Sequence, residues 1–477
     1  MRALPVLAAL LLPASFDSAL RGPAQDKQAK PLRDRLDALV QDLKLKDARV
    51  GILVFSVRDG AAVYAHDERE ALKLASNTKL LTTAAAICKL GPDFTFRTAV
   101  GTAGDGLHVF GGGDPNISGR FHDDDPTAIF KAWAAKLKAA GVARVGDIVL
   151  HGGIFDEVQT HPEWAIYDPW WWWGAPFGAL SLNDNCVDVT VEPAEPGKPC
   201  RVSLSPDTAY VTIDNKTQSA AKPQKPFGFT RARGTNGISL RGEVGAKATY
   251  SVAIHDPARY FGTVLRETLV RSGIEVAGKI EESPAPREDV KGFKELAVHE
   301  SGLLPTLGAC NKPSQNFYAE MLLRTLGWKL KGKGTTENGL AAVREFLVKE
   351  VGLEEVSQVD GSGLTRENSA SAADLVKLLL YMRKHRSGKD FAESLPANGV
   401  PKGTLRSRLT APDLKGRLRA KTGHVGGVST LSGYAESADG DTFVFSILVN
   451  SGAGVSTSPA DRLQDQVCEL LLRHKGE

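Results

Sequence analysis

The sequence predicts an α/β fold in which one sheet is built from both ends of the chain and is interrupted by a strand-rich insertion. A hairpin pattern stands near the start, where the apolar run 50–57 turns at Arg58-Asp59-Gly60 into a strand at 62–64. Three further strand patterns stand near the end, at 418–422, 429–436 and 442–450. Between residues 97 and 300, short strands and Gly/Pro turns dominate instead.

Helical patterns account for most of the remaining chain. An amphipathic pattern at 31–44 precedes the hairpin, and a helix-favouring run follows it directly after Asn77 and Thr78. Further helices are predicted at 127–140 and 259–272 in the insertion and at 314–326, 338–351, 373–385 and 460–474 after it. The polar segment 214–228, which contains two prolines, is predicted to be an exposed loop.

The N-terminus is typical of a secretory signal peptide, which we place at residues 1–24. Its apolar run, 3–14, is too short to cross a bilayer, and no later stretch reaches the 18 apolar residues of a membrane helix. We therefore expect an exported protein, periplasmic or extracytoplasmic, without an integral membrane span. We expect the main domain to be discontinuous and to comprise residues 25–96 and 301–477. The insertion, residues 97–300, is expected to form two subdomains.

Composition excludes several classes of partner and cofactor. The net charge is +3 over 477 residues, which argues against nucleic acid because phosphate binding needs a concentrated basic face. The ten histidines and five cysteines show no metal-ligand spacing, so we expect no metal and no cofactor. Cys186 and Cys200 can pair in an oxidising compartment, and the sequence leaves that pairing open.

The candidate nucleophile is Ser76, which forms an S-x-x-K pattern with Lys79 at the start of a predicted helix. Residues three apart share a face of a helix, so Lys79 is directed back at the Ser76 hydroxyl. A serine hydroxyl needs an adjacent base, and a lysine can serve only if burial or neighbouring cations lower its pKa. The pattern recurs at Ser219 and Lys222, but Pro223 follows and cannot continue a helix, so we treat the second match as a decoy.

Two more polar motifs lie in the C-terminal part of the chain. Ser314 and Asn316 open a predicted helix, which brings a hydroxyl and an amide together at its N-terminal end. Lys421-Thr422-Gly423 lies on the first of the three final strands, and a Lys-Thr-Gly triplet occurs nowhere else in the chain. The Ser-x-Asn pattern has its own decoy at Ser181-Leu182-Asn183. Each motif is common alone, but the three in this order are much more specific.

In this order the motifs resemble those of the penicillin-binding, active-site-serine D,D-peptidases, and most closely their D-alanyl-D-alanine carboxypeptidase/endopeptidase branch with inserted domains. The gap between Ser76 and Ser314 has room for such domains, whereas the gap from Ser314 to Lys421 has none. Other segments resemble the same branch, among them Asp360-Gly361-Ser362-Gly363, Gly403-Thr404-Leu405 and Gly111-Gly112-Gly113-Asp114-Pro115. The resemblance implies a penicillin-binding/β-lactamase-like serine transpeptidase domain, with an antiparallel sheet flanked by helices.

The resemblance also implies a reaction, the hydrolysis of D-Ala–D-Ala bonds in peptidoglycan peptides through an acyl-Ser76 intermediate. Ser76 would attack the carbonyl carbon while Lys79 takes its proton. Ser314, beside Lys421, would pass a proton to the leaving nitrogen. Asn316 would orient Lys79 and a substrate amide.

Substrate binding is assigned by the same resemblance to Thr422, Gly423 and His424. Lys421 and Thr422 would hold the C-terminal carboxylate, and the backbone N–H groups of Ser76 and His424 would bind the oxyanion. The family usually has Thr or Ser at the position of His424. The N–H is retained, but the missing hydroxyl bears on carboxylate recognition. β-Lactams are the expected inhibitors.

Two other interpretations of these motifs were weighed. A β-lactamase or esterase on the same fold would need a base that rapidly deacylates a β-lactam adduct, and the sequence identifies none. A non-catalytic peptidoglycan-binding protein would not need the intact motif residues. Carboxypeptidase and endopeptidase activities are not separable at this level, nor is the oligomeric state. The run Trp170–Trp173 fits a sugar-stacking platform or, more readily, an interdomain packing cluster, since large aromatics mostly bury area.

Overall fold

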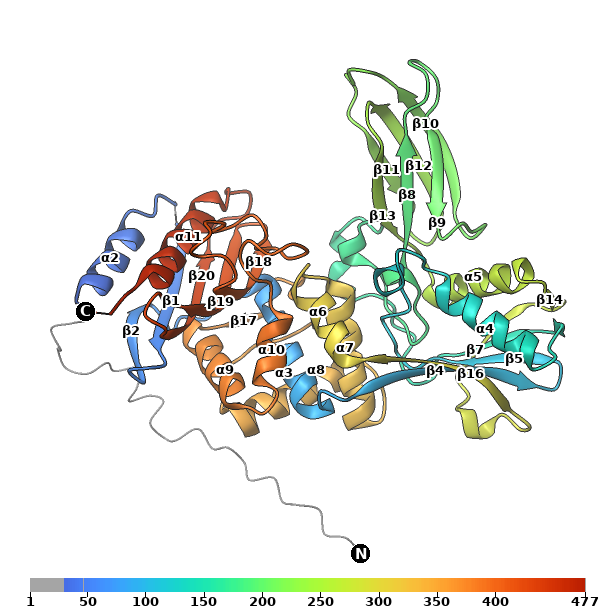
Figure 1. Ribbon diagram of the computed structural model, residues 1–477, viewed down its shortest axis with the longest axis horizontal. Helices are drawn as coiled ribbons and strands as arrows, with labels where there is room; N and C mark the ends of the chain where they lie inside the picture. Colours follow the sequence, from blue (N-terminus) through green and yellow to red (C-terminus); the bar gives the residue numbers. More distant parts are fainter. Residues whose placement is uncertain (1–29, 46, 477) are drawn as a thin grey trace, which may run out of the picture. The chain divides into compact units, whose positions relative to one another are not determined.

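The computed structural model describes residues 30–45 and 47–476 (Figure 1). The expected signal peptide, 1–24, lies outside this range. The described chain forms two compact units. The first unit contains the residues up to Asp93 together with Leu307–Leu330 and the chain from Thr336, and the second contains Phe94–Thr306 and Lys331–Thr335. The sequence analysis had set the limits of the insertion at 97 and 300.

A five-stranded antiparallel sheet forms the centre of the first unit (Figure 1). Its order is β18-β19-β20-β1-β2, and its strands are β1 (Arg49–Ser56), β2 (Ala61–His66), β18 (Leu418–Val425), β19 (Val428–Glu436) and β20 (Thr442–Asn450). The N-terminal β1 pairs with the C-terminal β20 along its whole length. The prediction of one sheet from both chain ends is therefore confirmed.

Helices cover both faces of this sheet, so its strands are buried on both sides. One face packs against α2 (Lys30–Gln41) and α11 (Ser458–Arg473), and the apolar core there includes Ile52, Phe445 and Leu431. The other face packs against α9 (Ala372–Lys384). Successive side chains of a strand point to opposite faces. Along β18, Leu418 and Ala420 belong to the α11 side, and the odd-numbered residues face the opposite side.

The helix that follows the hairpin is deeply buried. It is α3 (Thr78–Leu90), and every residue from Thr78 to Ile87 is buried. A single 3-10 turn, Ala75–Asn77, precedes it, so Ser76 lies in that turn and not in the α-helix itself. Neighbouring helices of the unit are α7 (Asn316–Lys331), α8 (Thr336–Phe346) and α10 (Gly388–Ser394).

The second unit is built around a mixed five-stranded sheet in the order β15-β7-β5-β4-β16, against which α4 (Ala128–Ala139) and α5 (Pro257–Arg271) pack. The strands of this sheet are β4 (Thr95–Ala103), β5 (Gly106–Phe110), β7 (Ile148–His151), β15 (Ile280–Ser283) and β16 (Lys294–Gly302). Two three-stranded sheets, β13-β8-β9 and β10-β12-β11, and one two-stranded sheet of β6 (Arg144–Val145) and β14 (Glu275–Val276) also belong to this unit. The strands of the three-stranded sheets are β8 (Cys186–Glu192), β9 (Arg201–Ser205), β10 (Thr212–Ser219), β11 (Gly228–Arg231), β12 (Gly237–Val244) and β13 (Ala248–Ala253).

Two local expectations need correction, and one open question is answered. The predicted loop 214–228 is wrong in its first part, because residues up to Ser219 pair with β12 and bury Thr217 and Ser219 despite their polarity. The helix predicted at 338–351 is α-helical only to Phe346 and continues as one π-helical turn. Cys186 and Cys200 are free thiols, so the open question of their pairing resolves against a bond.

Candidate active site

Ser76 and Lys79 meet at the start of α3. The amino group of Lys79 lies 2.9 Å from the Ser76 hydroxyl, to which it donates a hydrogen bond. The Lys79 side chain is fully buried, whereas Ser76 is partly exposed. A substrate can therefore reach the hydroxyl but not the amine behind it.

Two further acceptors hold the Lys79 amino group in place. Asn316 Oδ1 lies 2.6 Å from it, and the backbone carbonyl oxygen of Ser362 lies 2.8 Å from it. Burial lowers the pKa of Lys79 to about 8, although Cys310 and the carboxyl groups of Asp360 and Glu320 act in the opposite direction. An amine with this pKa exists partly in the neutral form near neutral pH, which a general base requires.

A second lysine–serine pair lies opposite the first. Lys421 donates a hydrogen bond to the Ser314 hydroxyl, 2.8 Å away, and another to the carbonyl oxygen of Thr422. Burial, and then the positive charge of Lys79, lower the pKa of Lys421. The two amines thus lie near enough to interact through their charges, and Ser314 is partly exposed, as Ser76 is.

Backbone strain marks the residues next to both hydroxyls. Ser314 has φ +64°, in the left-handed region that residues with a Cβ rarely adopt, and Ala75, directly before Ser76, has φ +45°. The sequence predicts that this helix begins at Ser314. Because Ser314 is in the left-handed region, helix α7 begins two residues later, at Asn316. Such strain persists only where surrounding contacts impose it, and it aims both hydroxyls toward the lysines.

Strand β18 approaches the Ser76 turn so closely that only glycine fits. A Cβ on Gly423 would lie 2.9 Å from the backbone nitrogen of Ser76 and 2.8 Å from the Leu74 carbonyl oxygen. β18 is an edge strand, and the N–H of Ala420 points outward to the Pro396 carbonyl. In a β-strand, the backbone N–H groups of residues i, i+2 and i+4 point to the same side. The N–H of His424 thus faces the open edge, near that of Ser76.

A pair of hydroxyl groups lies on the α11 side of β18. Thr422 donates a hydrogen bond to Thr404, with 2.8 Å between the two oxygens. The sequence analysis cited Gly403-Thr404-Leu405 only as part of the resemblance and gave Thr404 no role. No local spacing relates Thr404 to Thr422, so their pairing follows from the tertiary fold.

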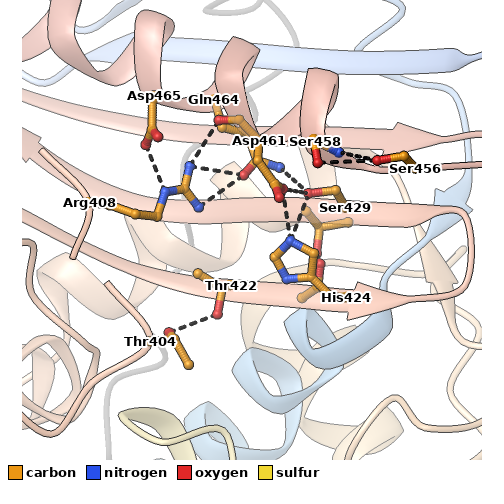
Figure 2. A network of polar contacts seen from close by, with 12 residues as sticks. Thr404, Arg408, Thr422, His424, Ser429, Ser456, Ser458, Asp461, Gln464 and Asp465 are labelled. Atoms are coloured by element: carbon orange, nitrogen blue, oxygen red, sulfur yellow. Dashed lines mark hydrogen bonds and ion pairs between the residues drawn. The ribbon is translucent and has the colours of Figure 1, made fainter. Parts of the chain in front are cut away.

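The His424 side chain belongs to a polar network on the same side (Figure 2). Its Nε2 lies 2.8 Å from Asp461 Oδ1 and 3.2 Å from the Ser429 hydroxyl. Burial alone would raise the pKa of Asp461, but hydrogen bonds from His424 and Ser429 outweigh it and leave that pKa below its usual value. Asp461 and Ser429 contact the same ring nitrogen, so the three residues do not form a Ser-His-Asp triad, in which the carboxylate holds the opposite nitrogen.

The network continues from α11 to the segment that carries Thr404 (Figure 2). Gln464 donates to the Ser429 hydroxyl at 2.9 Å and accepts from the Arg408 guanidinium at 3.2 Å. Arg408 also donates to Asp465, at 2.7 Å. The sequence analysis found none of these α11 and Arg408 partners, because they lie in separate segments without a recognisable motif.

The decoy motifs lie in the second unit and hold no similar arrangement. Ser219 is buried on β10, where its hydroxyl accepts a hydrogen bond from the Ala194 N–H. Ser181 donates to the backbone carbonyl oxygen of Gly178. Among the residues that the structure describes, no cluster of His, Cys, Asp and Glu could hold a metal ion, and no helix is long and apolar enough to cross a membrane.

Comparisons with known proteins agree with this geometry. Residues 32–473 match the model of the D-Ala-D-Ala carboxypeptidase 3 (S13) family. A curated D-alanyl-D-alanine carboxypeptidase of Actinomadura sp. (strain R39) is 32% identical over 99% of this chain and 90% of its own length. The D-alanyl-D-alanine carboxypeptidase DacB of Haemophilus influenzae is 26% identical over 86% of this chain and 88% of its own length. The crystal structure of penicillin binding protein 4 from Haemophilus influenzae shares the fold, with a TM-score of 0.77 at 22% identity, over 92% of this chain and 99% of that one.

Proposed function

Because the chain belongs to the D-Ala-D-Ala carboxypeptidase 3 (S13) family, we propose that Ser76 is the nucleophile of a serine-type D-Ala-D-Ala carboxypeptidase that acts on peptidoglycan peptides. One observation carries the assignment. Two partly exposed hydroxyls, Ser76 and Ser314, each accept a hydrogen bond from a fully buried lysine, Lys79 and Lys421 respectively. Buried amines with lowered pKa values can take up and release protons near neutral pH.

Acylation uses the first pair. The Ser76 oxygen attacks the carbonyl carbon of the penultimate D-Ala while neutral Lys79 takes the hydroxyl proton. The oxyanion that forms accepts hydrogen bonds from the N–H groups of Ser76 and His424, which are rigid donors and need no reorganisation. Asn316 holds Lys79 in line with Ser76 during this transfer, as its 2.6 Å contact suggests.

Departure of the terminal D-Ala uses the second pair. Ser314 donates its hydroxyl proton to the leaving nitrogen as the C–N bond breaks, and Lys421 replaces that proton. Lys421 and the Thr422 hydroxyl hold the terminal carboxylate, and the Thr404 hydroxyl, 2.8 Å from Thr422, lies where it can join them. Water then attacks the acyl ester, which releases the shortened peptide and restores the Ser76 hydroxyl.

Two finer properties follow from this proposal. Peptidoglycan lies outside the cytoplasmic membrane, so the protein acts in the periplasm or another extracytoplasmic space, as the signal-peptide pattern at 1–24 suggests. β-Lactams acylate Ser76 as inhibitors, which is supported by a solved structure of the Haemophilus influenzae protein complexed with a β-lactam. The likeness to a peptidoglycan endopeptidase of Bdellovibrio bacteriovorus, at 15% identity, extends to the fold alone.

The test is covalent labelling with a fluorescent penicillin, followed by a gel and an intact mass. We expect one adduct on Ser76 that persists for many minutes and is absent from Ser76→Ala. A peptide that ends in D-Ala-D-Ala should release one D-Ala per peptide. An adduct that maps to Ser219 contradicts the assignment, and rapid release with many turnovers of penicillin indicates a β-lactamase. A cross-linked dimer peptide, assayed in parallel, separates endopeptidase from carboxypeptidase activity.

A further inference from the structure

A buried carboxyl group adjoins the Lys79 site and has no part in the reaction above. Glu320 stands four residues after Asn316 on α7, so both side chains lie on the same face of that helix. Its side chain is almost fully buried, with a relative exposure of 1%. Its Oε2 accepts a hydrogen bond from the backbone N–H of Gly361, 3.1 Å away.

The short segment that Glu320 holds also supplies an acceptor to Lys79. The carbonyl oxygen of Ser362 accepts a hydrogen bond from the Lys79 amino group at 2.8 Å, and Ser362 directly follows Gly361. The carbonyl oxygen of Gly361 is held in turn by the Thr82 hydroxyl, also at 2.8 Å. Two of the three acceptors around Lys79 therefore depend on α7: Asn316 belongs to it, and Ser362 is positioned by Glu320.

The two carboxyl groups that act on Lys79 differ in their surroundings. Asp360 accepts hydrogen bonds from the N–H groups of Gly363 and Thr365, each at 2.7 Å, and from the Asn368 amide at 3.0 Å. The Oε1 atom of Glu320 is buried and has no hydrogen-bond partner among the described residues. A buried carboxylate oxygen without a donor is costly, so this arrangement favours the neutral acid. Burial, and then the negative charge of Asp360, raise the pKa of Glu320 to about 8, although the Ser362 hydroxyl, the Gly361 N–H and the charge of Arg324 act in the opposite direction.

We propose that Glu320 is a positioning residue for the general base, which acts as a neutral carboxylic acid. It holds the N–H of Gly361, one residue before the Ser362 carbonyl that directs Lys79 at Ser76, and it does so without a negative charge. The missing charge matters because an ionised carboxylate nearby would stabilise the ammonium form of Lys79 and keep it from accepting a proton. The proposal rests on the assignment of Ser76 as nucleophile and Lys79 as base.

The test compares Glu320→Gln with Glu320→Leu. Glutamine keeps an acceptor for the Gly361 N–H and is always neutral, whereas leucine has a similar size and no acceptor. We expect the rate of acylation by a fluorescent penicillin to stay within about threefold of wild type for Glu320→Gln and to fall about ten- to a hundredfold for Glu320→Leu. The pH profile of acylation is the readout that a merely structural role would not move. Below about pH 8, where Glu320 keeps its proton, the acidic limb of Glu320→Gln should follow that of wild type.

Thr325→Val serves as a matched control, because Thr325 is buried on the same helix and its hydroxyl donates a hydrogen bond to the Met321 carbonyl of that helix. Penicillin should acylate the Thr325→Val variant at the wild-type rate. The proposal is overturned if Glu320→Leu acylates at the wild-type rate. It is also overturned if Glu320→Gln is as slow as Glu320→Leu, or if its acidic limb moves to lower pH, because both results require an ionised Glu320. Absence of Ser76 labelling in wild type would instead refute the proposed function itself.

Discussion

His424 directs its imidazole at Asp461, with 2.8 Å between Nε2 and Oδ1, and so links the end of β18 to α11 (Figure 2). Ser429 contacts the same ring nitrogen, so both contacts use Nε2 and neither uses Nδ1. The side chain lies on the same face of β18 as Thr422, two residues away. The network thus fixes the position of the His424 side chain beside the proposed carboxylate site.

Replacing His424 by threonine is expected to improve the hydrolysis of a D-Ala-D-Ala peptide. The variant keeps the backbone N–H and adds a hydroxyl beside Thr422 and Thr404. A charge-assisted hydrogen bond to the substrate carboxylate is worth about 1.5–3 kcal/mol, so we expect kcat/KM at pH 8 to rise about ten- to a hundredfold. The measurement is kcat/KM for one peptide between pH 6 and pH 8.

Asp461→Asn, which keeps His424 but removes its anionic partner, is the companion variant. A wild-type enzyme that equals or exceeds His424→Thr at every pH would show that the imidazole serves a different substrate.

The pH dependence of acylation should follow the protonation of Lys79. Burial lowers the pKa of this amine to about 8, and only the neutral amine accepts a proton. The second-order rate constant of penicillin acylation should therefore rise with pH and level off above about pH 8. A pH series of acylation rates, with total active sites counted at each pH, measures this limb.

Lys79→Arg supplies the control, because arginine stays charged throughout this range. It should lose activity nearly as completely as Lys79→Ala. An arginine variant that keeps most of the activity would mean that only a positive charge is needed, and the proton acceptor would have to lie elsewhere.

Gly423→Ala should disable acylation by moving β18 away from Ser76. The new Cβ would lie 2.3 Å from Thr430 Oγ1 and 2.9 Å from the Ser76 nitrogen, so the strand or the turn must shift. Displacements of this kind cost about a hundredfold in rate when they misplace reacting groups. Gly308→Ala is the control, since a Cβ there meets nothing within 4 Å. Equal acylation rates for both variants would contradict the close approach.

Glu320 should also make stability depend on pH. Its pKa is raised to about 8 in the folded protein, above the value of about 4.3 in an unfolded chain, so the folded state binds the extra proton between these values. This contribution is fully present below about pH 4.3 and is lost as pH rises through about 8. The unfolding midpoint of Glu320→Gln, relative to wild type, should therefore increase from pH 5 to pH 8. A constant difference would show that Glu320 does not titrate in this range.

Much of the fold was accessible from the sequence because its signals are local. The alternation of apolar residues revealed the hairpin and the three final strands, and the sheet they form matches the prediction. Strands made of polar residues cannot be recognised in this way. β10 is half exposed and carries Asn215, Lys216 and Thr217, so its composition indicated a loop, and only pairing with β12 makes it a strand.

By itself the sequence determined which residues are candidates for the chemistry, because the spacing of Ser76 and Lys79, and the order of the three motifs, are properties of the chain. Tertiary structure alone decided how they meet. Glu320 and Asp461 lie in no motif, and the segments that contain Ser362 and Thr404 gave these two residues no role. Each of the four contacts a candidate residue, or the segment that positions one, across a long stretch of sequence. Such contacts depend on how buried segments pack, and burial also lowers the pKa values of the two lysines.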